Sequence, residues 1–139
     1  MVTGVGGFIG SAISHRLIEL GHTVIGVDDF STGSRGRVPS DVDLIEVSLA
    51  ETKALSSLPN DLDFVFHLAG QSSGEISFIN PVEDLEKNTV STLNLIEHSL
   101  KTNVKRLVYA SSMSVYGNSG DRPACESDRA MPLSCYGIG

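Results

Sequence analysis

Residues 3–10 carry glycines at positions 4, 7 and 10 directly after a short apolar segment, and this spacing constrains the fold of the 139-residue chain more than any other feature. Glycines so placed let the chain turn tightly after a strand, bring its backbone close to a pyrophosphate, and let the next helix pack on the sheet. The first amides of that helix then point at the phosphates. Asp28 ends the next apolar run, where a carboxylate accepts hydrogen bonds from ribose hydroxyls. The pattern predicts a site for a nicotinamide dinucleotide; the alternative is a glycine-rich turn that binds nothing.

Short apolar segments alternate with helical patterns along the whole sequence, which is typical of a parallel sheet covered by helices on both faces. The prediction is an α/β fold, a Rossmann-type doubly wound parallel sheet with strand order 3-2-1-4-5 and a ligand above the carboxyl ends of its strands. Helices are expected after residue 8, over residues 81–102, and from residue 132 onward. Strands are expected at residues 1–3, 23–27, 44–47, 63–68 and 106–111.

Two of these helices carry apolar stripes that are expected to face the sheet. Asn80 is expected to cap the long helix, with Pro81 at its first position. His67 is expected to be buried in its strand, whereas the histidines at positions 15, 22 and 98 are expected on the surface. In the first helix the stripe consists of Ile9, Ala12, Ile13, Leu17 and Leu20. In the long helix it consists of Leu85, Thr89, Thr92, Leu93, Ile96 and Leu100.

The composition argues against several classes of protein. Nucleic-acid binding requires clustered Lys and Arg, whereas the formal net charge of this chain is −7. Its apolar runs stay below the roughly 18 residues that a membrane span needs. The start of the chain lacks a signal-peptide pattern, so a cytoplasmic protein is expected. Cys125 and Cys135 do not have the spacing of metal ligands, so they are expected to be free thiols and no metal site is expected.

A second cluster of polar side chains occupies residues 110–117, at the end of the fifth expected strand. Hydroxyl groups at this place lie where a substrate binds to such a sheet. Tyr136 follows Ser112 by 24 residues, at the start of a helix. A tyrosinate there could take the proton of a substrate hydroxyl while the serine orients the oxygen. The alternative is that the serines serve only turns and helix caps.

These segments together resemble the extended short-chain dehydrogenases/reductases, in particular the NAD-dependent sugar-nucleotide epimerase/dehydratase family with its UDP-glucose 4-epimerases. The resemblance extends over essentially the whole chain at the family's usual spacing. It is carried by residues 3–11, 28–33, 67–71, 111–117 and 132–137, together with Asn88 and Thr92.

The resemblance implies roles for individual residues. Asp28 would hold the adenosine ribose of NAD. Ser112 would be the catalytic hydroxyl and Tyr136 the catalytic tyrosine; both would contact the substrate, as would Ser114. The residues implied to contact or support NAD are Gly4, Gly7, Phe8, Ile9, Gly10, Asp28, Asp29, Phe30, Ser31, Thr32, Gly33, Ser48, Leu49, Leu68, Ala69, Gly70, Gln71 and Asn88.

The sequence departs from the family pattern at two places that bear on function. The family usually has an Asp that meets the adenine at the end of the third strand, and here Ser48 and Leu49 take its place. Dehydratases of the family carry an acidic residue or pair just after the catalytic hydroxyl. Met113 and Ser114 stand there instead, and they cannot act as acid or base near neutral pH. This difference favours an epimerase over a dehydratase.

The expected reaction of the parent enzyme is therefore NAD-dependent epimerisation of a nucleoside-diphosphate sugar, at carbon 4. The negative charge of Asp28 should repel the extra phosphate of NADP, although Arg35 and Arg37 lie close enough in sequence to keep NADP as an alternative. The residues also leave open a dehydratase or reductase on the same scaffold, and an NAD-binding module without chemistry.

The family's catalytic signature is Tyr-x-x-x-Lys, and the sequence ends at Gly139, one residue before the position of that lysine. We therefore expect residues 1–139 to be an incomplete NAD-binding domain of a longer enzyme, clipped at both ends and without the C-terminal lobe that holds the sugar nucleotide. The isolated chain is expected to be inactive. The resemblance also implies a homodimeric parent, formed through the helix at residues 81–102 and the helix that begins near Tyr136.

Overall fold

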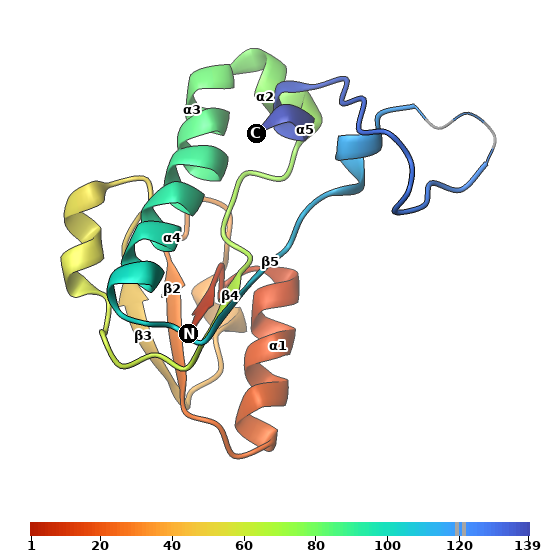
Figure 1. The fold of residues 1–139 in the computed structure, drawn as a ribbon. Helices are drawn as coiled ribbons and strands as arrows, with labels where there is room; N and C mark the ends of the chain where they lie inside the picture. The colour runs from red at the N-terminus through yellow and green to blue at the C-terminus, as the bar shows by residue number, and fades with distance from the viewer. Residues whose placement is uncertain (119, 121) are drawn as a thin grey trace.

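The computed structural model describes residues 1–118, 120 and 122–139, which form an open sheet with helices on both faces (Figure 1). The sheet has five parallel strands in the order β3-β2-β1-β4-β5, which confirms the predicted fold and strand order. Its central strand, β1, leads directly into the glycine-rich segment. The strands are β1 (Val2–Thr3), β2 (Val24–Asp28), β3 (Val42–Glu46), β4 (Phe64–His67) and β5 (Arg106–Tyr109).

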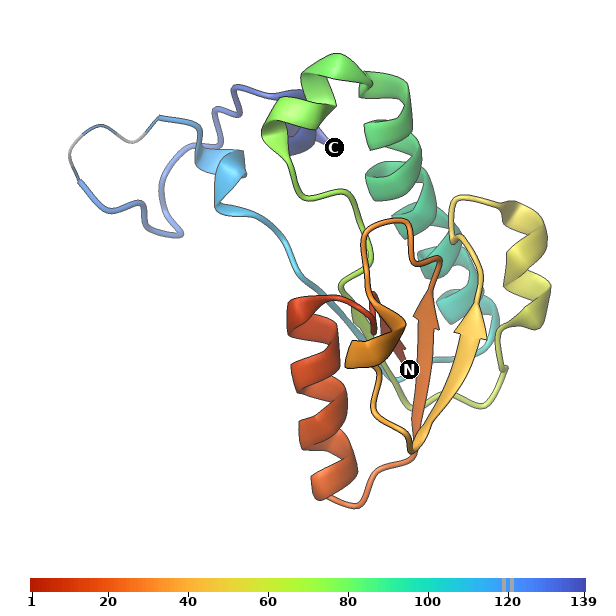
Figure 2. The same ribbon diagram turned by 180° about the vertical axis from the view of Figure 1, so that it is seen from behind.

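Helix α1 covers one face of the sheet, and α4 with the 3₁₀ helix η2 covers the other (Figure 1, Figure 2). Segments α3, η3 and α4 form one continuous rod, in which η3 is a π-helical turn. The rod extends beyond the carboxyl ends of the strands, where α2 and α5 pack beside α3. The helices are α1 (Phe8–Glu19), η1 (Arg35–Arg37), η2 (Thr52–Ser57), α2 (Gly74–Ile79), α3 (Pro81–Leu85), η3 (Glu86–Val90), α4 (Ser91–Lys101), η4 (Met113–Tyr116) and α5 (Cys135–Ile138).

Apolar side chains fill the space on both sides of the sheet. On the side of α1, Val2, Val5 and Val24 are buried, and Ile13 and Leu17 of the helix pack against them. On the side of α4 the buried residues come from the start of the chain, β2, β4, the helix and the loops that flank η2. They are Met1, Val27, Leu49, Leu58, Leu62, Val65 and Leu95. Burial on both faces explains why the central strands β1 and β2 read as nearly continuous apolar runs, whereas the edge strands β3 and β5 are largely exposed.

The buried face of α1 differs from the predicted stripe. Gly10 and Ser14 are buried in the helix, whereas Ile9 is 57% exposed and Leu20 55% exposed. A Cβ on Gly10 would lie 2.0 Å from the carbonyl oxygen of Gly4, so the helix has to turn its glycine toward the turn that precedes it. This close approach sets the rotation of α1. The predicted stripe members that it leaves exposed are Ile9, Ala12 and Leu20.

The long helix begins as predicted but buries another face. Asn80 caps it, since its Oδ1 accepts a hydrogen bond from the amide of Glu83 at 3.4 Å. The predicted stripe is wrong, because its leucines at positions 85, 93 and 100 are 51%, 60% and 75% exposed. The predicted surface position of His98 is also wrong: its Nε2 donates to the carbonyl oxygen of Pro59 at 3.0 Å. This face covers loop backbone as well as apolar side chains, so it is partly polar; its buried residues are Asp84, Asn88, Ser91, Leu95, His98 and Ser99.

Other expectations for single residues are confirmed. His67 is buried in β4, whereas the histidines at positions 15 and 22 are exposed. Cys125 and Cys135 are free thiols. Across residues 1–118, 120 and 122–139, none of the helices combines the length and the apolar character required to cross a membrane.

Candidate functional site

A cavity of about 400 Å³ lies at the carboxyl ends of the central strands, where the sequence predicts a ligand. Its walls come from the segments that follow β1, β2, β3, β4 and β5, from the rod, and from α5. A volume of this order is typical of a small-molecule or cofactor site. The cavity is lined by Gly4, Gly7, Phe8, Ile9, Gly10, Val27, Asp28, Asp29, Ser31, Thr32, Gly33, Val47, Ser48, Leu49, Ala50, Leu68, Ala69, Gly70, Ser72, Lys87, Ser91, Ala110, Ser111 and Tyr136.

The glycine turn presents the start of α1 to this cavity. Gly4 has a φ of +69°, and a Cβ there would lie 2.8 Å from the carbonyl oxygen of Leu68, so this position requires glycine. The first intrahelical hydrogen bond runs from the amide of Ser11 to the carbonyl oxygen of Gly7. The three amides before it have no acceptor within the helix, and the N-cap Gly7 has no side chain to offer one. Such a helix start is suited to bind phosphate.

The carboxylate of Asp28 stands at the end of β2, and the residue is only 8% exposed. Its Oδ2 accepts a hydrogen bond from the amide of Gly6 at 2.8 Å, and its Oδ1 accepts one from the amide of Phe30, also at 2.8 Å. Each oxygen keeps a further lone pair. The carboxylate therefore fixes the glycine turn and can still accept hydrogen bonds from ribose hydroxyls in the cavity.

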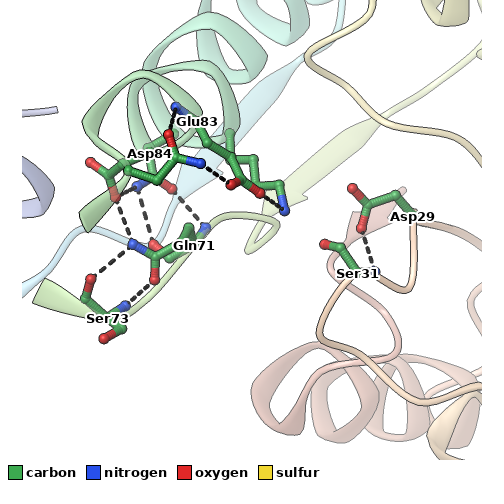
Figure 3. A network of polar contacts seen from close by, with 9 residues as sticks. Asp29, Ser31, Gln71, Ser73, Glu83 and Asp84 are labelled. Atoms are coloured by element: carbon green, nitrogen blue, oxygen red, sulfur yellow. Dashed lines mark hydrogen bonds and ion pairs between the residues drawn. The ribbon is translucent and has the colours of Figure 1, made fainter. Parts of the chain in front are cut away.

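Some residues of the loop after Asp28 line the cavity, and others lie outside it. Figure 3 shows Asp29, whose Oδ1 accepts a hydrogen bond from the amide of Ser31 at 2.9 Å, and both residues line the cavity. Phe30, which the resemblance implies as a cofactor contact, does not line it. Its backbone has a φ of 54°, and its ring lies 4.5 Å from the guanidinium carbon of Arg35. Arg35 is in addition ion-paired with Glu46, so these side chains support the loop from outside.

A chain of hydrogen bonds ties β1 to β4 beneath the cavity. Oγ1 of Thr3 accepts from the amides of Leu68 at 3.1 Å and Ala69 at 3.0 Å. Its own proton therefore goes to Nδ1 of His67, 2.8 Å away, and Nε2 of His67 donates to Thr92 Oγ1 at 2.9 Å. Burial lowers the pKa of His67 to about 4. His67 is thus a neutral residue that joins strands to the rod.

A buried polar network fixes the segment that follows β4 (Figure 3). Oδ1 of Asn88 accepts from the amide of Gln71 at 2.9 Å, and its Nδ2 donates to the Gln71 carbonyl oxygen at 3.1 Å. Asp84, only 2% exposed, accepts from Nε2 of Gln71 at 2.7 Å and from Nδ2 of Asn88 at 3.0 Å. Gln71 and Asn88 do not line the larger cavity. They act on it by holding residues 68–70, which do.

A smaller cavity of about 200 Å³ adjoins the first and brings the two predicted catalytic residues together. Ser112 lines it directly after β5, and Tyr136 reaches it from α5. Tyr136 lines both cavities, as do residues 68–70. Ser112 Oγ accepts a hydrogen bond from the amide of Ser114 at 3.1 Å, which leaves its own proton available to a ligand. Ser114, which the resemblance places on the substrate, lines neither cavity.

The turn after β3 lies at the cavity despite its departure from the family pattern. Ser48 and Leu49 both line the cavity, and Leu49 is only 4% exposed. Nδ2 of Asn94 donates to the carbonyl oxygen of Leu49 at 2.9 Å. Helix α4 therefore positions this turn through a side chain, and the cavity wall that it forms carries a hydroxyl where the family usually has a carboxylate.

The rod contributes two residues to the larger cavity that the sequence did not predict. Lys87 and Ser91 both line it, and they lie one helical turn apart. The available signal was their position beside Asn88, which the resemblance already placed under the cofactor. Within the part of the chain that the structure describes, no group of three or more His, Cys, Asp or Glu side chains could hold a metal ion.

The comparison with known proteins supports the same kind of site. Residues 1–139 match the family described as "NAD dependent epimerase/dehydratase family". The UDP-glucose 4-epimerase of Azospirillum brasilense is 31% identical over 139 residues, which are 99% of this chain and 40% of the relative. The chain thus spans less than half the length of this relative.

Two solved structures share the fold closely. The Thermus thermophilus UDP-glucose 4-epimerase in complex with NAD has a TM-score of 0.93 at 34% identity, over 99% of this chain and 45% of that one. The Thermotoga maritima UDP-glucose 4-epimerase with UDP-glucose has a TM-score of 0.92 at 37% identity, over 99% and 46%. Because the family match extends over every residue, the chain belongs to the NAD-dependent epimerase/dehydratase family.

Proposed function

We propose that this chain binds NAD in the larger cavity and serves as the cofactor-binding part of a sugar-nucleotide epimerase. One observation carries the proposal: the start of α1 and the Asp28 carboxylate face the same cavity, which adjoins a second one holding Ser112 and Tyr136. Free helix amides suit a diphosphate, and a hydrogen-bonded carboxylate suits ribose hydroxyls. The NAD complex of the Thermus thermophilus relative supports the choice of cofactor.

In the proposed reaction, a nucleoside-diphosphate sugar places its 4-hydroxyl in the smaller cavity. NAD, when bound, supplies the hydride acceptor and donor. Tyr136 takes the proton of the hydroxyl and later returns it, acting as general base and then general acid. Ser112 donates its free proton to the same oxygen while negative charge develops there. Substrate and product have the same oxidation state, so turnover leaves the cofactor unchanged overall.

The smaller cavity favours epimerisation over dehydration. Elimination of water from a sugar requires an acidic side chain near the reacting carbons. Among the described residues that line this cavity there is no Asp or Glu. Met113, which takes the place of an acidic residue in the dehydratases, is 79% exposed. The residues present can move a hydroxyl proton, which is what epimerisation needs.

The test is conversion of UDP-galactose to UDP-glucose, followed by proton NMR, with the protein expressed at its natural length. Tyr136→Phe should lower kcat at least about 100-fold, because it removes the general base. Tyr116→Phe is the matched control, since Tyr116 lines neither cavity, and it should retain wild-type turnover. Equal activity of the wild-type and Tyr136→Phe proteins would contradict the assignment of Tyr136.

The same assay separates the alternative functions. A steady change in NADH absorbance during turnover would indicate a reductase, and an unsaturated or deoxy sugar product would indicate a dehydratase. NAD binding without conversion of any nucleoside-diphosphate sugar would indicate a binding module. Each of these outcomes rejects the proposed epimerase while leaving the cofactor site in place.

We further propose that residues 1–139 are one part of a longer enzyme and that this parent enzyme is a homodimer. The proposal of a longer enzyme is supported by the relatives, of which the chain spans about two fifths to one half. Leu85, Leu93 and Leu100 give the rod an exposed apolar side, which supports a second copy as its partner.

A further inference from the structure

Lys87 is the only Lys or Arg among the described residues that line the larger cavity. It lies in η3, and its side chain is 25% exposed. Its Nζ is 2.8 Å from Oε1 of Glu83, one helical turn earlier. The ammonium therefore stands between a carboxylate on the rod and the open volume of the cavity. Figure 3 shows Glu83 on the rod, and Asp29 and Ser31 on a separate loop to one side of it.

The residues that line the cavity offer little positive charge to the diphosphate of a dinucleotide. Two carboxylic acids, Asp28 and Asp29, are among the residues that line the cavity. The diphosphate of a dinucleotide adds two more negative charges. The start of α1 supplies a partial charge of roughly half a unit. Without a further cation, the start of α1 would be the only source of positive potential for the phosphates among the described residues that line the cavity.

We propose that the ammonium of Lys87 binds the diphosphate of the dinucleotide cofactor, from the side opposite the start of α1. The proposal rests on the proposed function, because it assumes a dinucleotide in this cavity. Helix α1 and the rod cover opposite faces of the sheet, so their groups converge on the phosphates from two directions (Figure 1). Lys87 does not line the smaller cavity, which assigns it to the cofactor's diphosphate and not to that of a sugar nucleotide.

Glu83 opposes this contact, because its carboxylate binds the same ammonium. Its carboxylate accepts a hydrogen bond from Nδ2 of Asn80 at 2.6 Å, so it is fixed at the start of the rod. The hydrogen bond and positive charge of Lys87 keep the pKa of Glu83 below its usual value. Glu83 remains negative when the cavity is empty, restrains the ammonium at the rim, and competes with the phosphates for it. The two residues thus have opposite effects on cofactor binding.

Isothermal titration with NAD, ADP-ribose, adenosine and UDP tests the assignment on the protein at its natural length. Lys87→Gln should weaken NAD and ADP-ribose about 10-fold or more, because a hydrogen bond to a charged group is lost. It should leave adenosine unchanged, since adenosine has no phosphate. Lys87→Arg should restore most of the affinity, and Glu83→Gln should bind NAD at least as tightly as wild type.

Lys101→Gln is the matched control. Lys101 forms the same kind of pair on the same rod, 2.6 Å from Glu97 four residues earlier, but lies outside both cavities. The Lys101→Gln variant should bind NAD with the affinity of the wild-type protein. If Lys87→Gln and Glu83→Gln weaken NAD equally, the pair is only structural and the inference fails. A Lys87→Gln protein that loses UDP affinity while keeping NAD affinity would place the lysine on the substrate's diphosphate and also overturn it.

The outcomes separate this inference from the proposed function. A wild-type protein that binds neither NAD nor ADP-ribose rejects the proposed function and the inference together. A wild-type protein that binds NAD, with a Lys87→Gln variant that binds it equally well, rejects only the role of Lys87.

Discussion

At the scale of single residues, His67 links the protonation of one side chain to the stability of the sheet. Its pKa in the folded protein is about 4, against 6.5 for an unperturbed imidazole. Between these values the unfolded chain binds a proton that the folded chain does not, so the free energy of unfolding falls as the pH falls. The loss from this residue between about pH 7 and pH 5 should be about 2 kcal/mol.

Urea unfolding at the two pH values measures this loss, with His67→Asn as the comparison. The variant lacks the imidazole and should show a smaller decrease in unfolding free energy on acidification. The imidazole resonances of wild-type His67 should stay at their neutral position in NMR spectra down to pH 5. Protonation of His67 near pH 6.5 would contradict the hydrogen-bond chain through Thr3 and Thr92.

Asp28 should decide between the two nicotinamide dinucleotides. Its carboxylate already accepts hydrogen bonds from two backbone amides. Its negative charge should repel the extra phosphate that NADP carries on its ribose. We expect NAD to bind at least about 100-fold more tightly than NADP, because a like-charge contact costs several kcal/mol. Asp28→Asn should narrow this ratio, and Asp43→Asn, an exposed change on β3, should not. Equal wild-type affinities in a titration would argue against the assignment.

At the scale of elements, the approach of α1 to the glycine turn depends on one missing side chain. An alanine at Gly10 would place its Cβ 2.0 Å from the carbonyl oxygen of Gly4, so helix and turn would have to separate. Gly10→Ala should lower the free energy of unfolding by about 3 kcal/mol or more. Gly36→Ala, whose Cβ would meet nothing closer than 3.7 Å, should change it by less than about 0.5 kcal/mol. Thermal unfolding of both variants makes the comparison.

The five strands, α1 and the long helix could be predicted from the sequence, whereas the short helices α2 and η2 and the orientation of the long helices could not. Strand positions follow from continuous apolar runs, and these depend only on local composition. The rotation of α1 is set by contact between Gly10 and Gly4, which no periodicity contains. The rod misled the prediction for another reason: its buried face carries polar residues such as Asn88, and its exposed face carries leucines. The usual rule that the apolar face of a helix is the buried one therefore fails for this rod.

At the scale of the whole molecule, that exposed apolar face should govern assembly. Leu93 and Leu100 of α4 are 60% and 75% exposed. Sedimentation should find a dimer for the protein at its natural length, and Leu93→Asp with Leu100→Asp should weaken it by about 100-fold or more, because charge replaces apolar contact. Leu20→Asp is the control, since Leu20 is 55% exposed on the opposite face of the sheet, directly after α1. A monomeric wild-type protein would reject the proposed homodimer.

The candidate site was predictable where the sequence carries a steric or chemical pattern. Glycine spacing and Asp28 predicted the larger cavity, and a serine and a tyrosine predicted the smaller one. Phe30 and Ser114 were carried over by resemblance alone, and neither lines a cavity. Lys87 was missed because its contribution arises only when the rod crosses the carboxyl ends of the strands. Its one signal in the sequence was its position beside Asn88.

The network of Gln71, Asp84 and Asn88 connects residues 68–70, which form the floor of the cavity, to the start of the rod. Both backbone groups of Gln71 are bonded to the Asn88 side chain, so residues 68–70 cannot shift unless the rod moves with them. Regions joined in this way open cooperatively. In hydrogen-exchange experiments the amides of these two segments should therefore give one common free energy of opening. Asp84→Ala should accelerate both together while the amides of α1 keep their protection.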